Sequence, residues 1–253
     1  MTSPAIATDY LPGRAASLRV PADAGPSPLI VMVPGGGWAT ADPTGLVPLA
    51  EHLANDGAAT SLITYRTTDT QSTFPAAVDD VACAIRWSAR EAAAQGHSPT
   101  HVIVLGHSAG GHLASLVAFS GDSFGGDCPY PPVTVDGLIG LAGVYDTDAL
   151  RPALSSWMGV DPGQATEDWR RVNPMAWLAD GTGVAKGLRV LLLHGDADVS
   201  VPLEQTTELA DALTQDQFDV TTTVLPGLGH MEIFEAGNAE PPIRGWLDSW
   251  PQA

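Results

Sequence analysis

The sequence predicts an α/β fold, in which a mostly parallel central sheet is covered by helices on both faces. Short apolar runs alternate along the chain with longer segments of helical periodicity, the pattern that builds such a sheet. Several of these runs end in turns rich in glycine. The chain has 253 residues, of which 44% are hydrophobic and 16% charged, so we expect residues 1–253 to form a single domain with a substantial core.

The first half of the chain is expected to supply the edge and the centre of the sheet. The runs rich in β-branched and aliphatic residues are short enough to be strands, whereas the helical segments show apolar residues spaced by three and four. Gly57 and Gly96 are placed to end two of these helices. We expect antiparallel edge strands within residues 8–22, strands at residues 29–33, 59–65 and 101–105, and helices at residues 46–56, 74–95 and 109–119.

The second half continues the alternation but contains one long interruption. We expect strands at residues 135–144, 188–193 and 220–225 and helices at residues 203–213 and 243–250. The segment from about residue 146 to 187 carries Pro152, Pro162 and Pro174 and only short, irregular pieces. Because it is too long for a simple connection between two strands, we interpret it as a small cap insertion.

The charge balance excludes several classes of partner. Eleven basic and 29 acidic residues give a formal net charge of −18, which repels nucleic acid and anionic membranes. The N-terminus lacks the basic and apolar regions of a signal peptide, so a cytoplasmic protein is expected. Free thiols at Cys83 and Cys128 are then expected, although the sequence leaves open whether the two cysteines meet. It also leaves the oligomeric state open.

A strand, a sharp turn and a helix surround Ser108. The turn, Gly106-His107-Ser108-Ala109-Gly110, matches the G-x-S-x-G pattern of a nucleophile elbow, in which the glycines relieve crowding and the serine hydroxyl is exposed. A serine needs a base to take its proton and donors to receive the oxyanion. The pattern therefore predicts that Ser108 is a catalytic nucleophile.

The donors for an oxyanion are expected after the strand at residues 29–33. Gly36 and Gly37 leave their backbone N–H groups unobstructed, and the Ala109 N–H at the start of the nucleophile helix would complete the oxyanion hole. Trp38 follows directly and is expected to lie near the bound carbonyl, where it would limit the length of the acyl group. His107, beside the serine, is expected to line the site and contact the substrate.

The base and the acid are assigned from chain order, because this arrangement places nucleophile, acid and base in that sequence. Of the seven histidines, only His230 lies downstream of a plausible acid, in a Gly-rich loop after a strand. Asp198 is preferred as the acid because it lies further into its loop than Asp196, which is expected to tie down the turn. His112 is expected to line or pack the site, and His194 to be structural.

Three segments together carry a resemblance to a known family. They are Pro34-Gly35-Gly36-Gly37-Trp38, Gly106-His107-Ser108-Ala109-Gly110-Gly111-His112, and His194-Gly195-Asp196-Ala197-Asp198-Val199-Ser200-Val201-Pro202. With them the chain resembles serine esterases of the α/β-hydrolase fold, in particular the bacterial carboxylesterase group that includes feruloyl-esterase-like and kynurenine-formamidase-like proteins. Pro34 is a departure, since hormone-sensitive-lipase-like relatives usually carry histidine before the glycines.

The resemblance implies hydrolysis through an acyl-enzyme intermediate, with a small-molecule ester or amide as substrate and with neither a metal nor an organic cofactor. We expect carboxylic esters with short acyl chains. Aryl-formamide hydrolysis remains an alternative, and a non-catalytic binding protein of the same fold a further one. Trp157, Trp169 and Trp177 in the insertion fit either a substrate-facing wall or simple packing.

Overall fold

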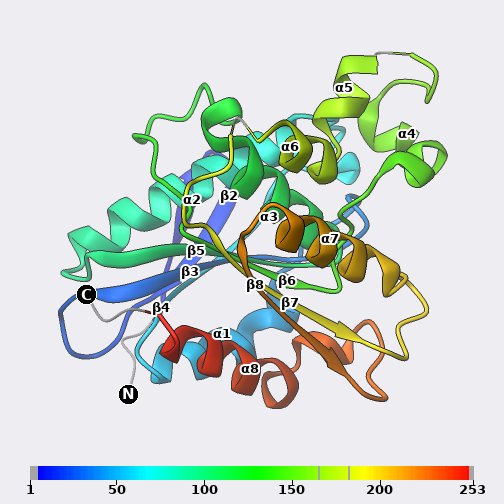
Figure 1. The fold of residues 1–253 in the computed structure, drawn as a ribbon. Helices are drawn as coiled ribbons and strands as arrows, with labels where there is room; N and C mark the ends of the chain where they lie inside the picture. Colours follow the sequence, from blue (N-terminus) through cyan, green and yellow to red (C-terminus); the bar gives the residue numbers. More distant parts are fainter. Residues whose placement is uncertain (1–4, 165, 182, 251–253) are drawn as a thin grey trace.

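Eight strands form one sheet through the centre of the molecule (Figure 1). The computed structural model describes residues 5–164, 166–181 and 183–250. The strand order is β1-β2-β4-β3-β5-β6-β7-β8; β1 and β2 pair antiparallel at one edge, β2 pairs antiparallel with β4, and all later pairs are parallel. The strands are β1 (Ile6–Leu11), β2 (Arg14–Arg19), β3 (Ser27–Val33), β4 (Ala59–Ile63), β5 (Pro99–His107), β6 (Gly137–Leu141), β7 (Arg189–Gly195) and β8 (Asp219–Leu225).

The central strands are apolar on both sides because helices cover both faces of the sheet. In β3 every residue from Leu29 to Val33 is buried, as a parallel strand between two helical layers requires. Val33 pairs with Gly106 of β5. Two glycine-rich turns, after β3 and after β5, therefore begin side by side at one edge of the sheet.

The helices divide between the two faces. Figure 1 shows α1 and α8 below the sheet, with α2, α3, α6 and α7 above it. The bounds are α1 (Val47–Asn55), α2 (Ala76–Ala94), α3 (Ala109–Ser120), α4 (Arg151–Met158), α5 (Thr166–Arg171), α6 (Pro174–Asp180), α7 (Glu204–Gln215) and α8 (Ala236–Asp248). Each face has its own apolar core, one built around α2 and α3 and the other around α1 and α8. Within the described residues, no helix has the length and apolar character that crossing a bilayer requires.

The last helix begins earlier than the sequence pattern indicates. We expected it from residue 243, but α8 starts at Ala236 and includes Pro241 and Pro242. Its buried stripe begins at Ala239 and continues through Ile243 and Trp246. The packing of this stripe against the sheet offsets the two backbone hydrogen bonds that the prolines cannot donate.

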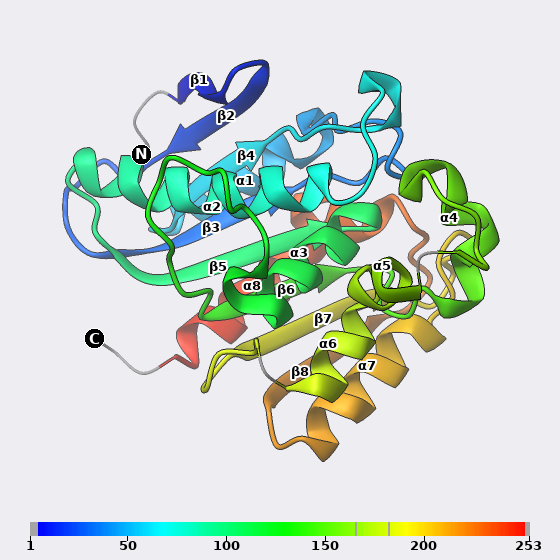
Figure 2. The ribbon, with the colours of Figure 1, turned by 90° about the horizontal axis from the view of Figure 1, so that it is seen from above.

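The segment between β6 and β7, for which the sequence suggests a cap, contains the three short helices α4, α5 and α6. Figure 2 shows α4 and α5 beyond the carboxyl end of the sheet and α6 beside α7. Trp157 and Trp177 are nearly buried, and Trp169 is fully buried. The indoles of Trp169 and Trp177 donate to backbone carbonyls within the same segment, and all three tryptophans pack into the apolar core around α2 and α3.

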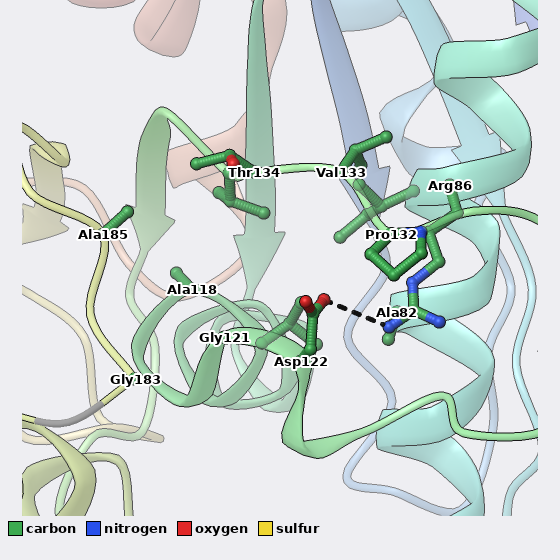
Figure 3. A pocket seen from close by; sticks show the side chains of 13 residues that line it. Ala82, Arg86, Ala118, Gly121, Asp122, Pro132, Val133, Thr134, Gly183 and Ala185 are labelled. Atoms are coloured by element: carbon green, nitrogen blue, oxygen red, sulfur yellow. Dashed lines mark hydrogen bonds and ion pairs between the residues drawn. The ribbon is translucent and has the colours of Figure 1, made fainter.

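Cys83 and Cys128 form a disulfide, and the expectation of free thiols is wrong. Cys83 lies in α2, and Cys128 lies in the loop after the 3₁₀ turn at Gly121–Ser123, with the two Cα atoms 5.4 Å apart. Arg86, one turn further along α2, donates to the Gly125 carbonyl over 2.7 Å. Figure 3 shows Arg86 reaching Asp122 at the rim of a pocket of about 290 Å³ beside this loop. These contacts fold the loop back onto α2, which sequence spacing alone does not reveal.

Candidate active site

Ser108 lies at the turn between β5 and α3, in a backbone conformation that is rare for residues other than glycine. Its φ angle is +54° and its ψ angle −122°. The glycines on both sides are required by close packing: a Cβ on Gly106 would collide with the Gly110 backbone, and one on Gly110 with the Val33 carbonyl. The Ser108 N–H donates to the Leu141 carbonyl of the neighbouring strand β6 over 3.0 Å, which fixes the turn.

Asp198 and His230 meet at the same edge of the sheet. Asp198 follows β7 and His230 follows β8, two neighbouring strands that run parallel. The His230 Nδ1–H donates to the Asp198 Oδ2 over 2.7 Å. The Asp198 side chain is 1% exposed and that of His230 is 14% exposed. Because Nδ1 carries the proton that Asp198 accepts, Nε2 is left as the nitrogen that can accept another proton.

The Asp198 carboxylate is held by the backbone of its own loop. Its Oδ1 accepts from the N–H groups of Ser200 over 2.7 Å and of Val201 over 3.0 Å. Burial alone would raise the pKa of Asp198, but the Val201 N–H, the His230 ring and the Ser200 N–H outweigh that effect and lower the pKa. Asp198 therefore stays ionised beside His230 at neutral pH.

His194 contacts the loop that contains Asp198, in agreement with its expected structural role. It is fully buried; its Nε2 donates to the Val201 carbonyl over 3.0 Å and its Nδ1 accepts from the Thr206 hydroxyl over 2.7 Å. Burial lowers the pKa of His194, so the ring is neutral. Its Nε2 also lies 3.4 Å from the Asp198 Oδ2, the oxygen that accepts from His230.

Asp196 bonds to the backbone of the loop after β8 rather than to the His230 ring. Its Oδ1 accepts from the Gly227 N–H over 2.6 Å, so the side chain joins the loop after β7 to the loop after β8. We expected Asp196 to stabilise its own turn, but its hydrogen bond instead joins that turn to the neighbouring loop. Of the two aspartates, only Asp198 contacts the histidine.

His107 connects the serine turn to the histidine loop. Its Nε2 donates to the His230 carbonyl over 2.9 Å, and the two imidazole rings lie 4.7 Å apart. Burial, with a smaller contribution from the neighbouring His230, lowers the pKa of His107 to about 4, so its ring is neutral near pH 7. His107, which the sequence predicts to contact the substrate, thus also fixes the backbone of His230.

A pocket of about 480 Å³ opens in front of Ser108, within the range of small-molecule sites. Fourteen residues line it: Pro34, Gly35, Gly36, Gly37, Thr40, Asp42, Thr44, Gly45, Leu46, His107, Ser108, His230, Met231 and Phe234. The Gly36 carbonyl accepts from the N–H groups of Ala39 and Thr40, so its oxygen is used inside the turn after β3. Gly36 and Gly37 face the same space as Ser108, and Ala109 begins the helix that follows the serine.

Trp38 packs between the turn after β3 and the insertion, and its expected place near the bound carbonyl stays a prediction. Its indole Nε1 donates to the His112 Nδ1 over 3.1 Å, its ring stacks on Trp157 with centroids 5.7 Å apart, and it is not among the residues that line the pocket. The Nε2 of the fully buried His112 donates in turn to the Val172 carbonyl over 2.7 Å. Trp38 therefore joins the turn after β3 to α3 and, through Trp157, to α4.

Sequence reasoning missed the outer wall of the pocket. Asp42, Thr44, Met231 and Phe234 line it, but none belongs to a motif and their spacing carries no signal. Met231 and Phe234 follow His230 so closely that their proximity to the site could have been inferred. In the part of the chain that the structure describes, no three His, Cys, Asp or Glu side chains gather as ligands of a metal ion.

A family model described as BD-FAE matches residues 18–213 of this chain. Among curated relatives, a "Probable carboxylic ester hydrolase LipM" of Mycobacterium tuberculosis is 30% identical over 199 residues, which cover 76% of this chain and 46% of that protein. A "Probable isoprenylcysteine alpha-carbonyl methylesterase ICMEL2" of Arabidopsis thaliana is 26% identical, covering 90% of this chain and 56% of that protein. The chain thus spans about half the length of these curated relatives.

Solved structures share the fold over nearly the whole chain. An esterase of Thermogutta terrifontis, Est2 with bound propionate, superposes with a TM-score of 0.78 at 22% identity and covers 96% of this chain and 92% of that one. A truncated carbohydrate esterase from gut microbiota gives a TM-score of 0.78 at 20% identity, covering 98% and 95%. At these identities the likeness establishes the α/β-hydrolase fold.

Proposed function

We propose that this chain, which belongs to the BD-FAE family, hydrolyses carboxylic esters through a covalent acyl-enzyme intermediate. The observation that carries the proposal is the 2.7 Å hydrogen bond from His230 to the buried Asp198, at a pocket that also contains Ser108. A serine in a strained turn, a histidine with a free Nε2 and a buried carboxylate are the parts that acyl transfer requires. The curated relatives named as ester hydrolases favour esters over aryl formamides.

Each residue would act in turn. Ser108 Oγ attacks the acyl carbonyl while His230 Nε2 takes its proton, and the same nitrogen then gives that proton to the departing alcohol. Asp198 keeps His230 in the required tautomer and stabilises the imidazolium that forms. Water, activated by His230, finally attacks the acyl-enzyme and releases the acid and Ser108.

The negative charge on the carbonyl oxygen needs fixed donors. We assign this role to the backbone N–H groups of Gly36, Gly37 and Ala109. Both glycines line the pocket beside Ser108. Their φ angles of +137° and +58° are rare for residues with a Cβ, and the lack of a Cβ leaves their backbone N–H groups accessible. Ala109 is the first residue of α3, where an N–H has no partner within the helix and the helix dipole favours an anion.

The finer assignments rest on the surroundings of the pocket. We propose short acyl chains, because the described residues of the insertion at 146–187, which would act as a small cap, form no helix longer than the eight residues of α4. We also propose that residues 1–253 act as one domain. The disulfide between Cys83 and Cys128 favours an oxidising compartment over the cytoplasm that the sequence suggested.

Labelling by a fluorophosphonate tests the nucleophile. The wild-type protein should bind the probe covalently and hydrolyse p-nitrophenyl acetate, whereas Ser108→Ala should lose the label and reduce kcat by about 10⁴-fold or more while remaining folded. Ser98→Ala, which removes an exposed hydroxyl elsewhere, is the matched control and should behave as wild type. Retained labelling of Ser108→Ala, or a wild type inactive on every ester, would contradict the proposal.

A further inference from the structure

The pocket in front of Ser108 has a side that receives the alcohol of the ester. In the proposed reaction, the departing oxygen must reach His230 to take its proton. The walls beyond the glycines come from the loop of that histidine, through Met231 and Phe234, and from the turn that contains Asp42 and Thr44. We call these four residues and the space between them the alcohol pocket.

Asp42 gives the alcohol pocket a negative charge. Among the described residues that line the whole pocket it is the only acidic one, and none of them is Lys or Arg. Its Oδ1 accepts from the Thr44 N–H over 3.0 Å, so the turn holds the carboxylate in place. The backbone and hydroxyl of Thr44 lower the pKa of Asp42, so its carboxylate is ionised near neutral pH.

An aromatic ring faces the same space. A Cβ placed on Gly45 would come within 3.2 Å of the Phe234 ring, so Phe234 packs against the turn of Asp42. The ring centroids of Phe234 and His107 lie 4.7 Å apart, which places Phe234 next to the catalytic edge. Met231 beside it is 60% exposed and so is free to meet a substrate. A carboxylate beside an aromatic ring is the combination that attracts ammonium groups.

We propose that the preferred esters carry a positively charged alcohol, an amino or quaternary ammonium alcohol, and that Asp42 is the residue that selects for this charge. The inference rests on the proposed ester hydrolysis and names its substrate class. By Coulomb's law in a partly hydrated pocket, a carboxylate would strengthen the binding of an ammonium group by about fivefold if the two charges lay about 8 Å apart. The formal net charge of −18 acts in the same direction but is screened by salt beyond about 8 Å.

Two esters of equal shape separate charge from size. Acetylcholine carries a trimethylammonium group where 3,3-dimethylbutyl acetate carries a tert-butyl group of similar size. The ratio of the kcat/KM value of the first ester to that of the second therefore measures selection for positive charge. In the Asp42→Asn variant the amide oxygen can still accept from Thr44, and only the charge is lost. We expect the ratio to fall by about threefold to tenfold in this variant.

The matched control is Asp127→Asn, which removes the same charge from an exposed loop position outside the pocket and should keep the wild-type ratio. Raising the salt concentration from about 0.05 M to about 0.5 M should lower the wild-type ratio towards that of Asp42→Asn. Equal ratios in wild type and Asp42→Asn, or an equal fall in Asp127→Asn, would overturn the role of Asp42. Failure to hydrolyse any ester, p-nitrophenyl acetate included, would instead overturn the proposed function, and this inference with it.

Discussion

Asp198 combines burial with full hydrogen bonding. Its side chain is 1% exposed, and both oxygens accept hydrogen bonds, from Ser200 and Val201 on one side and from His230 on the other. A buried carboxylate without such donors would be protonated and could not orient a histidine. The backbone of the loop therefore decides which of two aspartates in the same turn can serve as the acid.

Replacing the two aspartates by asparagine should separate their roles. Asp198→Asn is expected to lower kcat by about 10³-fold to 10⁴-fold, because an amide favours the wrong His230 tautomer. Asp196→Asn should retain most of the activity, because the amide oxygen can still accept from Gly227, and should act through a modest loss of stability. Steady-state kinetics and thermal unfolding on both variants provide the measurement; a larger kinetic loss in Asp196→Asn would reverse the assignment.

Residues in motifs could be predicted from the sequence, while the direction of a side chain in a strained turn could not. Ser108, Asp198 and His230 each follow a recognisable strand, and parallel strands bring their carboxyl ends together. Trp38 follows a strand too, but its φ angle of +59° lies in the left-handed region, which a bulky residue rarely adopts. That conformation turns the indole towards His112, and its stability depends on contacts from distant segments.

At the scale of elements, α2 and the loop after α3 are joined by several links. The disulfide from Cys83 closes a sequence separation of 45 residues, and Arg86 donates to two carbonyls of the same loop, those of Gly125 and Phe124. The Oδ1 of Asp79 in α2 also accepts from the Gly125 N–H over 2.7 Å. These links were not predictable, because a loop rich in glycine and proline gives no signal about where it returns.

Reduction of the disulfide should destabilise the protein without unfolding it at room temperature. In the chain-entropy model, a disulfide that closes a loop of this length raises the free energy of unfolding by about 4 kcal/mol, and measured values are commonly about 2–4 kcal/mol. We expect dithiothreitol to lower the Tm of the wild type by several degrees and to leave that of the Cys83→Ala/Cys128→Ala double variant unchanged. If the reduced wild type, with both thiols verified by titration, kept its Tm, the link would contribute nothing.

For the molecule as a whole, three buried neutral histidines couple stability to pH. Burial lowers the pKa of both His107 and His112 to about 4, and it lowers the pKa of His194 as well. Unfolded chains carry histidines with a pKa of about 6.5, so between about pH 6.5 and 4 the unfolded state binds more protons than the folded state. Stability should therefore fall as the pH falls through this window. Asp42, Asp198 and Glu167 have lowered pKa values, so the stability that they contribute is lost as the pH falls below about 5.

Urea unfolding between about pH 7 and pH 4.5 measures this slope. Each histidine that stays neutral contributes up to about 1.4 kcal/mol per pH unit within the window. His112→Gln should reduce the slope of the unfolding free energy against pH by an amount that corresponds to about one bound proton. This reduction is expected whatever the effect of the substitution on stability at pH 7. His52→Gln, which removes an exposed imidazole, should keep the wild-type slope. Parallel slopes in wild type and His112→Gln would show that His112 is not the group responsible.

The strand β6 stands between the strands of the serine and the acid, yet it contributes none of the three residues. It leads instead into the segment that returns at β7, so that segment is inserted after a strand that carries none of the three residues of the proposed triad. Near the site the segment contacts Trp38 through Trp157 and His112 through the Val172 carbonyl, and elsewhere its apolar side chains join the core around α2 and α3. A change in the length of this segment would therefore leave the strands of the triad connected as they are, provided that the replacement keeps the side chains that fill this core.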